Sequence, residues 1–153
     1  MNILFLCTGN ISRSYLAEML LKYEISRGGL SGINCLSAGI LENNGMPADP
    51  FMVEYLVKKE IPHGNHSARL ITALDVSWAD RILVMEKRHR RFIQERWPEA
   101  DTKVEMLSMY VSPDQADDAI IDPFGKGPFY YRLAQSQITL AIKALYKKLE
   151  RKQ

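Results

Sequence analysis

The sequence predicts an α/β fold in which helices cover both faces of a parallel sheet. Short apolar runs, typical of buried strands, alternate along the chain with longer segments whose apolar residues recur every three or four positions, as in amphipathic helices. Strands that alternate with helices pair in parallel, because each helix carries the chain back across the sheet. The 153 residues contain no internal repeat and no interdomain linker, so we expect a single-domain protein over residues 1–153.

Two strands and two helices are expected in the first part of the chain. Ile3–Leu6 is a continuous apolar run and predicts a buried strand. A helix is expected over residues 14–28, where a glycine pair ends it. Residues 33–37 alternate apolar and polar side chains and predict a second strand. Asp49 followed by Pro50 is a favourable helix start, and this helix is expected to run to Glu60.

Two more strands and three helices are expected in the remainder. The spacing of Thr72 and Asp75 is that of a capping box and predicts a short helix. Residues 81–85 have a continuous apolar core and predict a third strand, suited to a parallel sheet. Residues 86–97 predict a helix that must stop before a proline. Residues 104–107 predict the fourth strand and residues 128–151 the last helix. Ligands of such sheets bind beyond the carboxyl ends of the strands, so function is expected in the loops there.

Composition excludes several classes of protein. A hydrophobic content of 46% with 25% charged residues is ordinary for a soluble globular protein, and a net charge of +2 is too small to indicate a nucleic-acid partner. The basic run Lys87–Arg91 lacks interleaved aromatic residues, so we expect a solvated helix face. No apolar run approaches the ~18 residues of a membrane span. The two cysteines, Cys7 and Cys35, make no disulfide framework; Cys35 is expected in the core and the protein in the cytoplasm, without a membrane partner.

The loop between the first strand and the first helix predicts an anion site. It reads Cys-Thr-Gly-Asn-Ile-Ser-Arg-Ser, and in such a loop the backbone amides converge while the helix dipole adds partial positive charge. Gly9 permits a sharp backbone path and Asn10 tolerates left-handed geometry. The residues expected to bind phosphate are Thr8, Gly9, Asn10, Ile11, Ser12, Arg13 and Ser14.

Two side chains of this loop add a chemical proposal. Cys7 faces the loop amides, a helix N-terminus and Arg13, so we expect it to be a thiolate nucleophile at neutral pH. Arg13 offers a planar fork that binds two phosphate oxygens together. Ser14 is placed to donate a hydrogen bond to the sulfur.

Attack by a thiolate on a phosphate ester also needs a proton donor for the leaving group. The acidic connection over residues 112–127 is long for a compact domain and such loops are usually functional. Asp122 is the expected general acid, because Pro123 stiffens its backbone and Phe124 offers a ring neighbour. The other aspartates of the connection are Asp114, Asp117 and Asp118.

The octet Cys7–Ser14 resembles the phosphate-binding loop of low-molecular-weight protein tyrosine phosphatases, in particular the bacterial type. Asp122–Phe124 is similar to the general-acid segment of that family, and Ser37–Gly39 to the segment after its second strand. His66 and Arg69 also fall where the family has similar residues, so the resemblance covers essentially the whole chain in order. It implies a flavodoxin-like, three-layer sandwich with a four-stranded parallel sheet in the order 2-1-3-4.

The resemblance implies a protein-tyrosine-phosphatase that works through a cysteinyl-phosphate intermediate, without metal or cofactor. The implied partner is a tyrosine-phosphorylated protein, by analogy a bacterial tyrosine kinase, and the implied state is a monomer or a weak homodimer. The residues implied to brace the loop are Asn10, Ser14, Ser37 and His66. Those implied to line the substrate cleft are Ile11, Ile40, Met46 and Phe124.

Three departures and two alternatives bear on this interpretation. Many members carry a second cysteine where Ser12 stands, so this chain cannot protect its oxidised nucleophile by a disulfide there. Thiol-dependent arsenate reductases need further cysteines downstream of Cys35, and none follows. Phosphoarginine-selective relatives favour threonine where Ile11 stands, so Ile11 favours a flat aromatic ester, although a phosphoarginine phosphatase stays an alternative. The other alternative is a non-catalytic flavodoxin-like module that binds FMN or a phosphoprotein, which has no use for Cys7 or Asp122.

Overall fold

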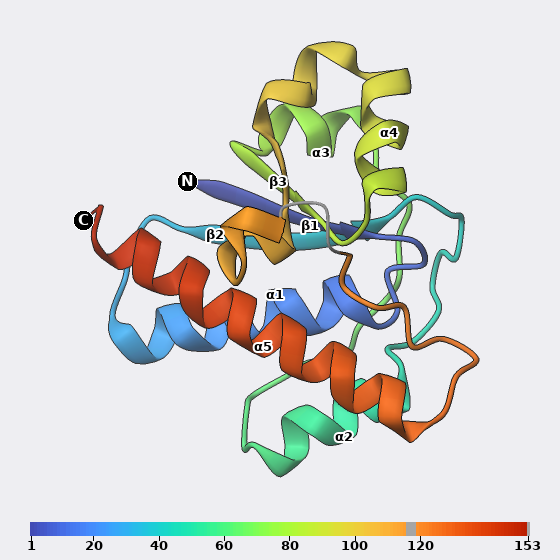
Figure 1. Cartoon of the computed structure of the whole chain (residues 1–153), viewed down its shortest axis with the longest axis vertical. Coiled ribbons are helices and arrows are strands. Elements are labelled where there is room, and N and C mark those ends of the chain that lie inside the picture. The colour runs from blue at the N-terminus through green and yellow to red at the C-terminus, as the bar shows by residue number, and fades with distance from the viewer. Residues whose placement is uncertain (116–118, 153) are drawn as a thin grey trace.

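The computed structural model describes residues 1–115 and 119–152 and shows an α/β sandwich around one sheet (Figure 1). Four parallel strands lie in the order β2-β1-β3-β4, which confirms the expected topology. Three helices cover one face of the sheet and two cover the other (Figure 1). The strands are β1 (Asn2–Cys7), β2 (Asn34–Gly39), β3 (Arg81–Val84) and β4 (Val104–Met106). The helices are α1 (Arg13–Gly28), α2 (Pro50–Lys58) and α5 (Pro128–Glu150) on the first face, and α3 (Ala73–Trp78) and α4 (Lys87–Arg96) on the second.

The central strand β1 explains why the core has two halves. Successive side chains of a strand point to opposite faces, so Ile3, Phe5 and Cys7 pack with α1, α2 and α5. Leu4 and Leu6 pack with α3 and α4 on the other face. A strand buried on both faces has to be continuously apolar, which is the pattern of the sequence there.

Parallel pairing brings the carboxyl ends of the strands to one edge of the sheet. Cys7, the last residue of β1, pairs with Gly39, the last residue of β2. A Cβ atom on Gly39 would lie 2.8 Å from the carbonyl oxygen of Thr8 and 2.9 Å from the amide nitrogen of Asn10. Only glycine therefore lets β2 end directly against the loop that follows Cys7.

The structure also corrects and extends the expectations at particular positions. The run Lys87–Arg91 is not wholly solvated, because His89 turns inward and is completely buried. Three short 3₁₀ helices were not expected: η1 (Pro98–Lys103), η2 (Leu107–Tyr110) and η3 (Pro113–Gln115). Cys35 is buried as expected, and burial raises the pKa of its thiol to about 12, so the thiol stays protonated.

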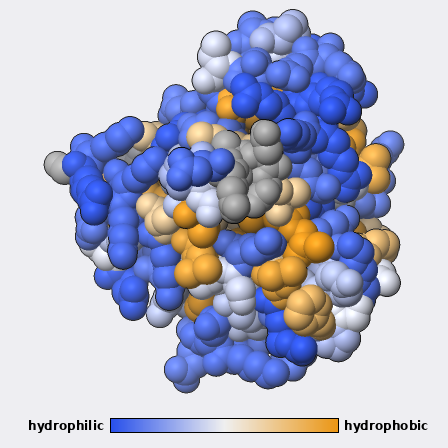
Figure 2. Space-filling view, viewed as in Figure 1, coloured by the Kyte–Doolittle hydropathy of each residue, from blue (hydrophilic) through white to orange (hydrophobic). Residues whose placement is uncertain are grey.

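The surface of the molecule carries both hydrophobic and hydrophilic regions. In the view of Figure 2, hydrophobic side chains gather near α5, whereas the surface over α4 is mostly hydrophilic. Within residues 1–115 and 119–152, no helix combines the length and the apolar character needed to cross a membrane.

Candidate active site

Cys7 lies where β1 ends and the loop begins. Its Sγ atom is 3.0 Å from the Ser14 hydroxyl oxygen and accepts a hydrogen bond from the backbone N–H of Asn10 at 3.3 Å. Cys7 is only 3% exposed, and it lines a pocket at this edge of the sheet. The loop wraps around the sulfur because Asn10 adopts a left-handed conformation with φ of 55°, as expected from its residue type.

A hydrogen-bond network centred on Asn10 holds the loop in this shape. The Asn10 side-chain amide donates to the hydroxyls of Ser14 and Ser37, both at 2.9 Å. Its side-chain oxygen accepts from the backbone N–H of Arg69 at 3.1 Å. The backbone oxygen of Asn10 is 2.6 Å from the His66 ring. The four residues that the family resemblance implied as braces are thus brought together in one network.

Arg13 begins α1 and points back under the loop. Its Nη1 donates to the backbone oxygen of Ile120 at 2.8 Å, and its Nη2 lies 2.8 Å from the Glu86 carboxylate. Burial tends to raise the pKa of Glu86, but Arg88 and Arg13 outweigh that effect and hold this pKa below its ordinary value. A carboxylate that stays ionised keeps the buried guanidinium compensated and fixed in orientation.

Asp122 lies at the mouth of the same pocket. Its carboxylate is 3.5 Å from Arg13 and 3.7 Å from Arg88, and it accepts a hydrogen bond from the Phe124 N–H at 3.2 Å. The pocket has a volume of about 340 Å³. It is lined by Cys7, Thr8, Gly9, Ile11, Ser12, Arg13, Leu41, Asn43, Met46, Asp122 and Phe124.

The wall of the pocket differs from the expectation at one position. Ile11, Met46 and Phe124 line it as expected, but Ile40 instead packs against the α3 and α4 half of the core. The backbone N–H groups of Ile40 and Leu41 both donate to the carbonyl oxygen of Thr8 at 2.9 Å, and Leu41 takes the place in the wall.

Of the other three aspartates of the acidic connection, the structure describes only Asp114. Asp114 lies in η3, and it is not among the residues of the pocket wall. Asp117 and Asp118 lie outside the described residues.

Sequence reasoning missed a second brace, on the opposite side of the loop. Ser12 donates to the carboxylate of Asp49 at 2.7 Å, and the Tyr131 hydroxyl donates to the same oxygen. The backbone N–H of Asp49 also bonds to the Ile11 carbonyl at 3.0 Å. The helix-capping role of Asp49 was visible in the sequence, whereas its contact with the loop depends on how α2 packs.

This arrangement can bind and cleave a phosphate ester. The loop amides and Arg13 are groups that suit phosphate oxygens, Cys7 offers a sulfur nucleophile in the same pocket, and Asp122 offers a carboxyl group there. Within the part of the chain that the structure describes, no group of three or more His, Cys, Asp or Glu side chains could hold a metal ion.

Comparison with known proteins points to the same chemistry. The family model described as "Low molecular weight phosphotyrosine protein phosphatase" matches residues 2–153. The protein-arginine-phosphatase of Geobacillus stearothermophilus is 35% identical over 99% of this chain and 97% of its own. The probable low molecular weight protein-tyrosine-phosphatase EpsP of Ralstonia solanacearum is 37% identical over 93% of this chain and 91% of its own. A solved structure of a YwlE arginine phosphatase mutant, with a phosphorylated active site serine, superposes with a TM-score of 0.90 at 32% identity, over 99% of this chain and 97% of that chain.

Proposed function

The chain belongs to the low molecular weight phosphotyrosine protein phosphatase family and is a phosphoric monoester hydrolase, and from that premise we propose that it dephosphorylates phosphotyrosine in proteins through a phosphoryl group carried on Cys7. One observation carries the proposal: Cys7, Arg13 and Asp122 line a single pocket with apolar walls.

The proposed reaction has two steps. The Cys7 thiolate attacks phosphorus and forms the S–P bond, while the bond from phosphorus to the phenolic oxygen breaks and Asp122 gives that oxygen its proton. In the second step a water molecule attacks phosphorus while Asp122 takes a proton from that water. The S–P bond breaks, which restores the Cys7 thiolate and releases inorganic phosphate as the second product. The Ser14 hydroxyl, 3.0 Å from the sulfur, is placed to stabilise the thiolate before the first step and after the second.

Similarity to a mutant with a phosphorylated active site serine supports a covalent step. In that mutant, a serine of the active site carries the phosphoryl group. We propose Cys7 for this role because it is the cysteine in the wall of the pocket, whereas Cys35 lies in the core.

The walls of the pocket favour an aromatic ester over phosphoarginine. Ile11, Leu41, Met46 and Phe124 present apolar surface to a leaving group, which suits a flat ring. Phosphoarginine is the second candidate, because two of the similar proteins are protein-arginine-phosphatases. Among the residues that line the pocket, Asp122 is the one carboxylate that could pair with a guanidinium leaving group.

The deciding experiment compares matched peptides that carry phosphotyrosine, phosphoarginine or phosphoserine at one position. We expect phosphate release from the phosphotyrosine peptide to be favoured in kcat/KM by at least about tenfold, which corresponds to about 1.4 kcal/mol. The variant Ile11→Thr should reduce the preference for phosphotyrosine over phosphoarginine, because it replaces part of the apolar wall by a hydroxyl. Equal or faster release from phosphoarginine by the unmutated enzyme would assign the second function instead.

We also propose that the partner is a tyrosine-phosphorylated protein, such as a bacterial tyrosine kinase, met in the cytoplasm by a monomer or weak homodimer. A reducing compartment suits the site, because Cys7 has to stay a free thiol and Ser12 offers it no disulfide partner.

A further inference from the structure

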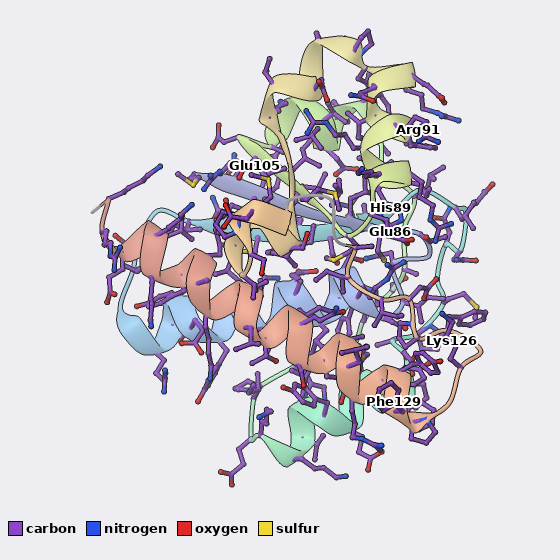
Figure 3. All side chains as sticks on the ribbon, viewed as in Figure 1. Glu86, His89, Arg91, Glu105, Lys126 and Phe129 are labelled. Atoms are coloured by element: carbon purple, nitrogen blue, oxygen red, sulfur yellow. The ribbon has the colours of Figure 1, made fainter. Side chains whose placement is uncertain are left out.

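His89 is the one histidine among Lys87–Arg91 and behaves unlike its basic neighbours. It lies in the first turn of α4 and is 0% exposed, whereas Arg91 on the same helix is exposed. Figure 3 shows His89 next to Glu86 at the end of α4 that faces the sheet, with Arg91 pointing away. A completely buried imidazole needs partners for both ring nitrogens.

Both nitrogens have partners, and together these fix the tautomer. Nδ1 accepts the backbone N–H of Glu86 at 3.1 Å, so the ring proton of the neutral form is on Nε2. Nε2 then donates to the Thr8 hydroxyl oxygen at 2.9 Å. A doubly protonated ring would turn a donor toward the Glu86 N–H and lose that bond.

The charged groups around the ring also favour the neutral form. Burial, with Arg13 and Arg88 nearby, lowers the pKa of His89 to about 3. The Glu86 carboxylate, 3.7 Å from Nε2, opposes this shift but does not overcome it. His89 is therefore uncharged over the range in which histidines ordinarily titrate.

The two hydrogen-bond partners of His89 both belong to the candidate active site, one in the phosphate loop and one beside Arg13. Thr8 follows Cys7 directly and lines the pocket. Glu86 is the residue whose carboxylate holds Arg13 at 2.8 Å. One rigid ring thus links the start of the phosphate loop to the carboxylate that orients the phosphate-binding arginine.

We propose that His89 is a positioning residue of this phosphatase, which ties Thr8 to the first turn of α4 so that the loop amides and Arg13 converge on the same phosphate. The inference rests on the proposed function and adds a residue that acts through others, since His89 itself does not line the pocket. This link needs a side chain with both a donor and an acceptor, which an amide offers and an aliphatic side chain does not.

The first test uses the unmutated protein and does not depend on turnover. Nitrogen-15 NMR of the imidazole should show a neutral ring with its proton on Nε2 from about pH 8 down to pH 5, the range in which ordinary histidines charge. A ring that becomes charged within that range, or carries its proton on Nδ1, would overturn the proposal even if the enzyme is a phosphatase.

The second test compares three variants in turnover of an aryl phosphate and in affinity for inorganic phosphate. His89→Leu keeps a side chain of similar size but removes the hydrogen bonds to Thr8 and to the Glu86 N–H. It should therefore lower kcat/KM by about tenfold or more and weaken phosphate binding. His89→Gln keeps an amide donor and acceptor and should recover a large part of that loss. Arg91→Gln, on the exposed side of the same helix, should match the unmutated enzyme.

Coupling to Thr8 separates positioning from a merely structural role. If His89 acts through Thr8, the losses caused by His89→Leu and Thr8→Val should be clearly less than additive in the double variant. Fully additive losses, or a folded His89→Leu enzyme with unchanged kcat/KM and phosphate affinity, would contradict the proposal. If His89→Leu does not fold, the NMR result and a double variant of His89→Gln with Thr8→Val still test whether His89 acts through Thr8.

Discussion

At the scale of single residues, the orientation of Arg13 depends on two hydrogen-bond acceptors of the protein, a backbone carbonyl and a carboxylate. Nη1 bonds to the backbone oxygen of Ile120 and Nη2 to the Glu86 carboxylate, each at 2.8 Å. A guanidinium has five N–H donors in a fixed plane, so it can hold both acceptors and still present donors to phosphate. An ammonium is a point charge without that plane.

We therefore expect Arg13→Lys to lose both catalysis and phosphate affinity, with kcat/KM lower by roughly a hundredfold, about 2.7 kcal/mol. Steady-state kinetics and phosphate titration give the two quantities. Arg90→Lys is the matched control, because Arg90 pairs with Asp101 away from the pocket and should leave both unchanged. A lysine enzyme that keeps its catalytic constant and its phosphate affinity would contradict this role of Arg13.

Asp122 carries a prediction about the leaving group. If Asp122 gives a proton to the departing oxygen, Asp122→Asn should slow aryl phosphates with poor leaving groups far more than those with good ones. The measurement is the rate against leaving-group pKa. Asp114→Asn, in η3 and outside the pocket wall, should show the slope of the unmutated enzyme. An unchanged slope in Asp122→Asn would mean that another group supplies the proton.

At the scale of elements, the start of α2 is part of the active-site scaffold. Asp49 caps this helix by accepting the Phe51 N–H at 3.0 Å, and the same carboxylate accepts hydrogen bonds from Ser12 and Tyr131. The cap of α3 offers a contrast, since the Thr72 hydroxyl bonds to Asp75, which pairs with Arg69 and so is one residue removed from the loop. The two caps allow the energy of capping to be separated from the energy of bracing.

The variant Asp49→Ala should lower the free energy of unfolding by about 2–4 kcal/mol, the sum of a lost cap and of buried hydroxyls left without an acceptor. It should also weaken phosphate binding. Thr72→Ala should cost only about 1 kcal/mol and leave kinetics unchanged. Urea unfolding and phosphate titration of both variants test this, and equal effects of the two on phosphate affinity would show that Asp49 does not brace the loop.

At the scale of the whole molecule, the site is assembled from segments that are distant in sequence but end at one edge of the sheet. β1 ends at Cys7, β2 ends at Gly39 against the loop, and β3 leads into Glu86. The Ile120 N–H bonds to the Met85 carbonyl at 2.9 Å, which places the segment that contains Asp122 beside β3. The position of the site therefore depends on the fold as a unit.

Much of this assembly was predictable from the sequence, and the exceptions share a cause. The strands and helices followed from apolar periodicity, and the phosphate loop followed from a specific octet, whose resemblance to a known family also implied the strand order. The inward turn of His89 was not predictable, because a histidine in a basic run is exposed unless a partner such as Thr8 lies beneath it. The exchange of Ile40 for Leu41 in the pocket wall is a shift of one residue, decided by backbone bonds to Thr8 that no local pattern encodes.

The buried neutral His89 also predicts how stability depends on pH. Its pKa is about 3 when folded against 6.5 ordinarily, so below about pH 6.5 the unfolded chain binds a proton that the folded chain does not. Stability should therefore fall as pH falls, by about 1.6 kcal/mol between pH 6.5 and pH 5, with a slope that approaches 1.36 kcal/mol per pH unit at the lower end. Asp75 and Glu86, whose pKa values are also lowered, add to this loss only near and below their ordinary values of 3.8 and 4.5.

Urea unfolding at a series of pH values measures this dependence. His89→Gln should remove most of the slope between about pH 6.5 and 5, whereas His63→Gln, at an exposed position, is the control and should retain it. An unmutated protein whose stability is flat over that range would contradict a His89 pKa that is lowered by folding.

The central claim is that the phosphoryl group of a substrate passes through Cys7, and trapping the intermediate tests it most directly. The enzyme is mixed with excess phosphotyrosine peptide, denatured within milliseconds and digested, and mass spectrometry locates the phosphoryl group. We predict a phosphoryl group on the Cys7 sulfur of the unmutated enzyme, and neither a phosphorylated enzyme nor hydrolysis with Cys7→Ala. Hydrolysis that continues in Cys7→Ala, or a phosphoryl group trapped on any residue other than Cys7, would contradict the account.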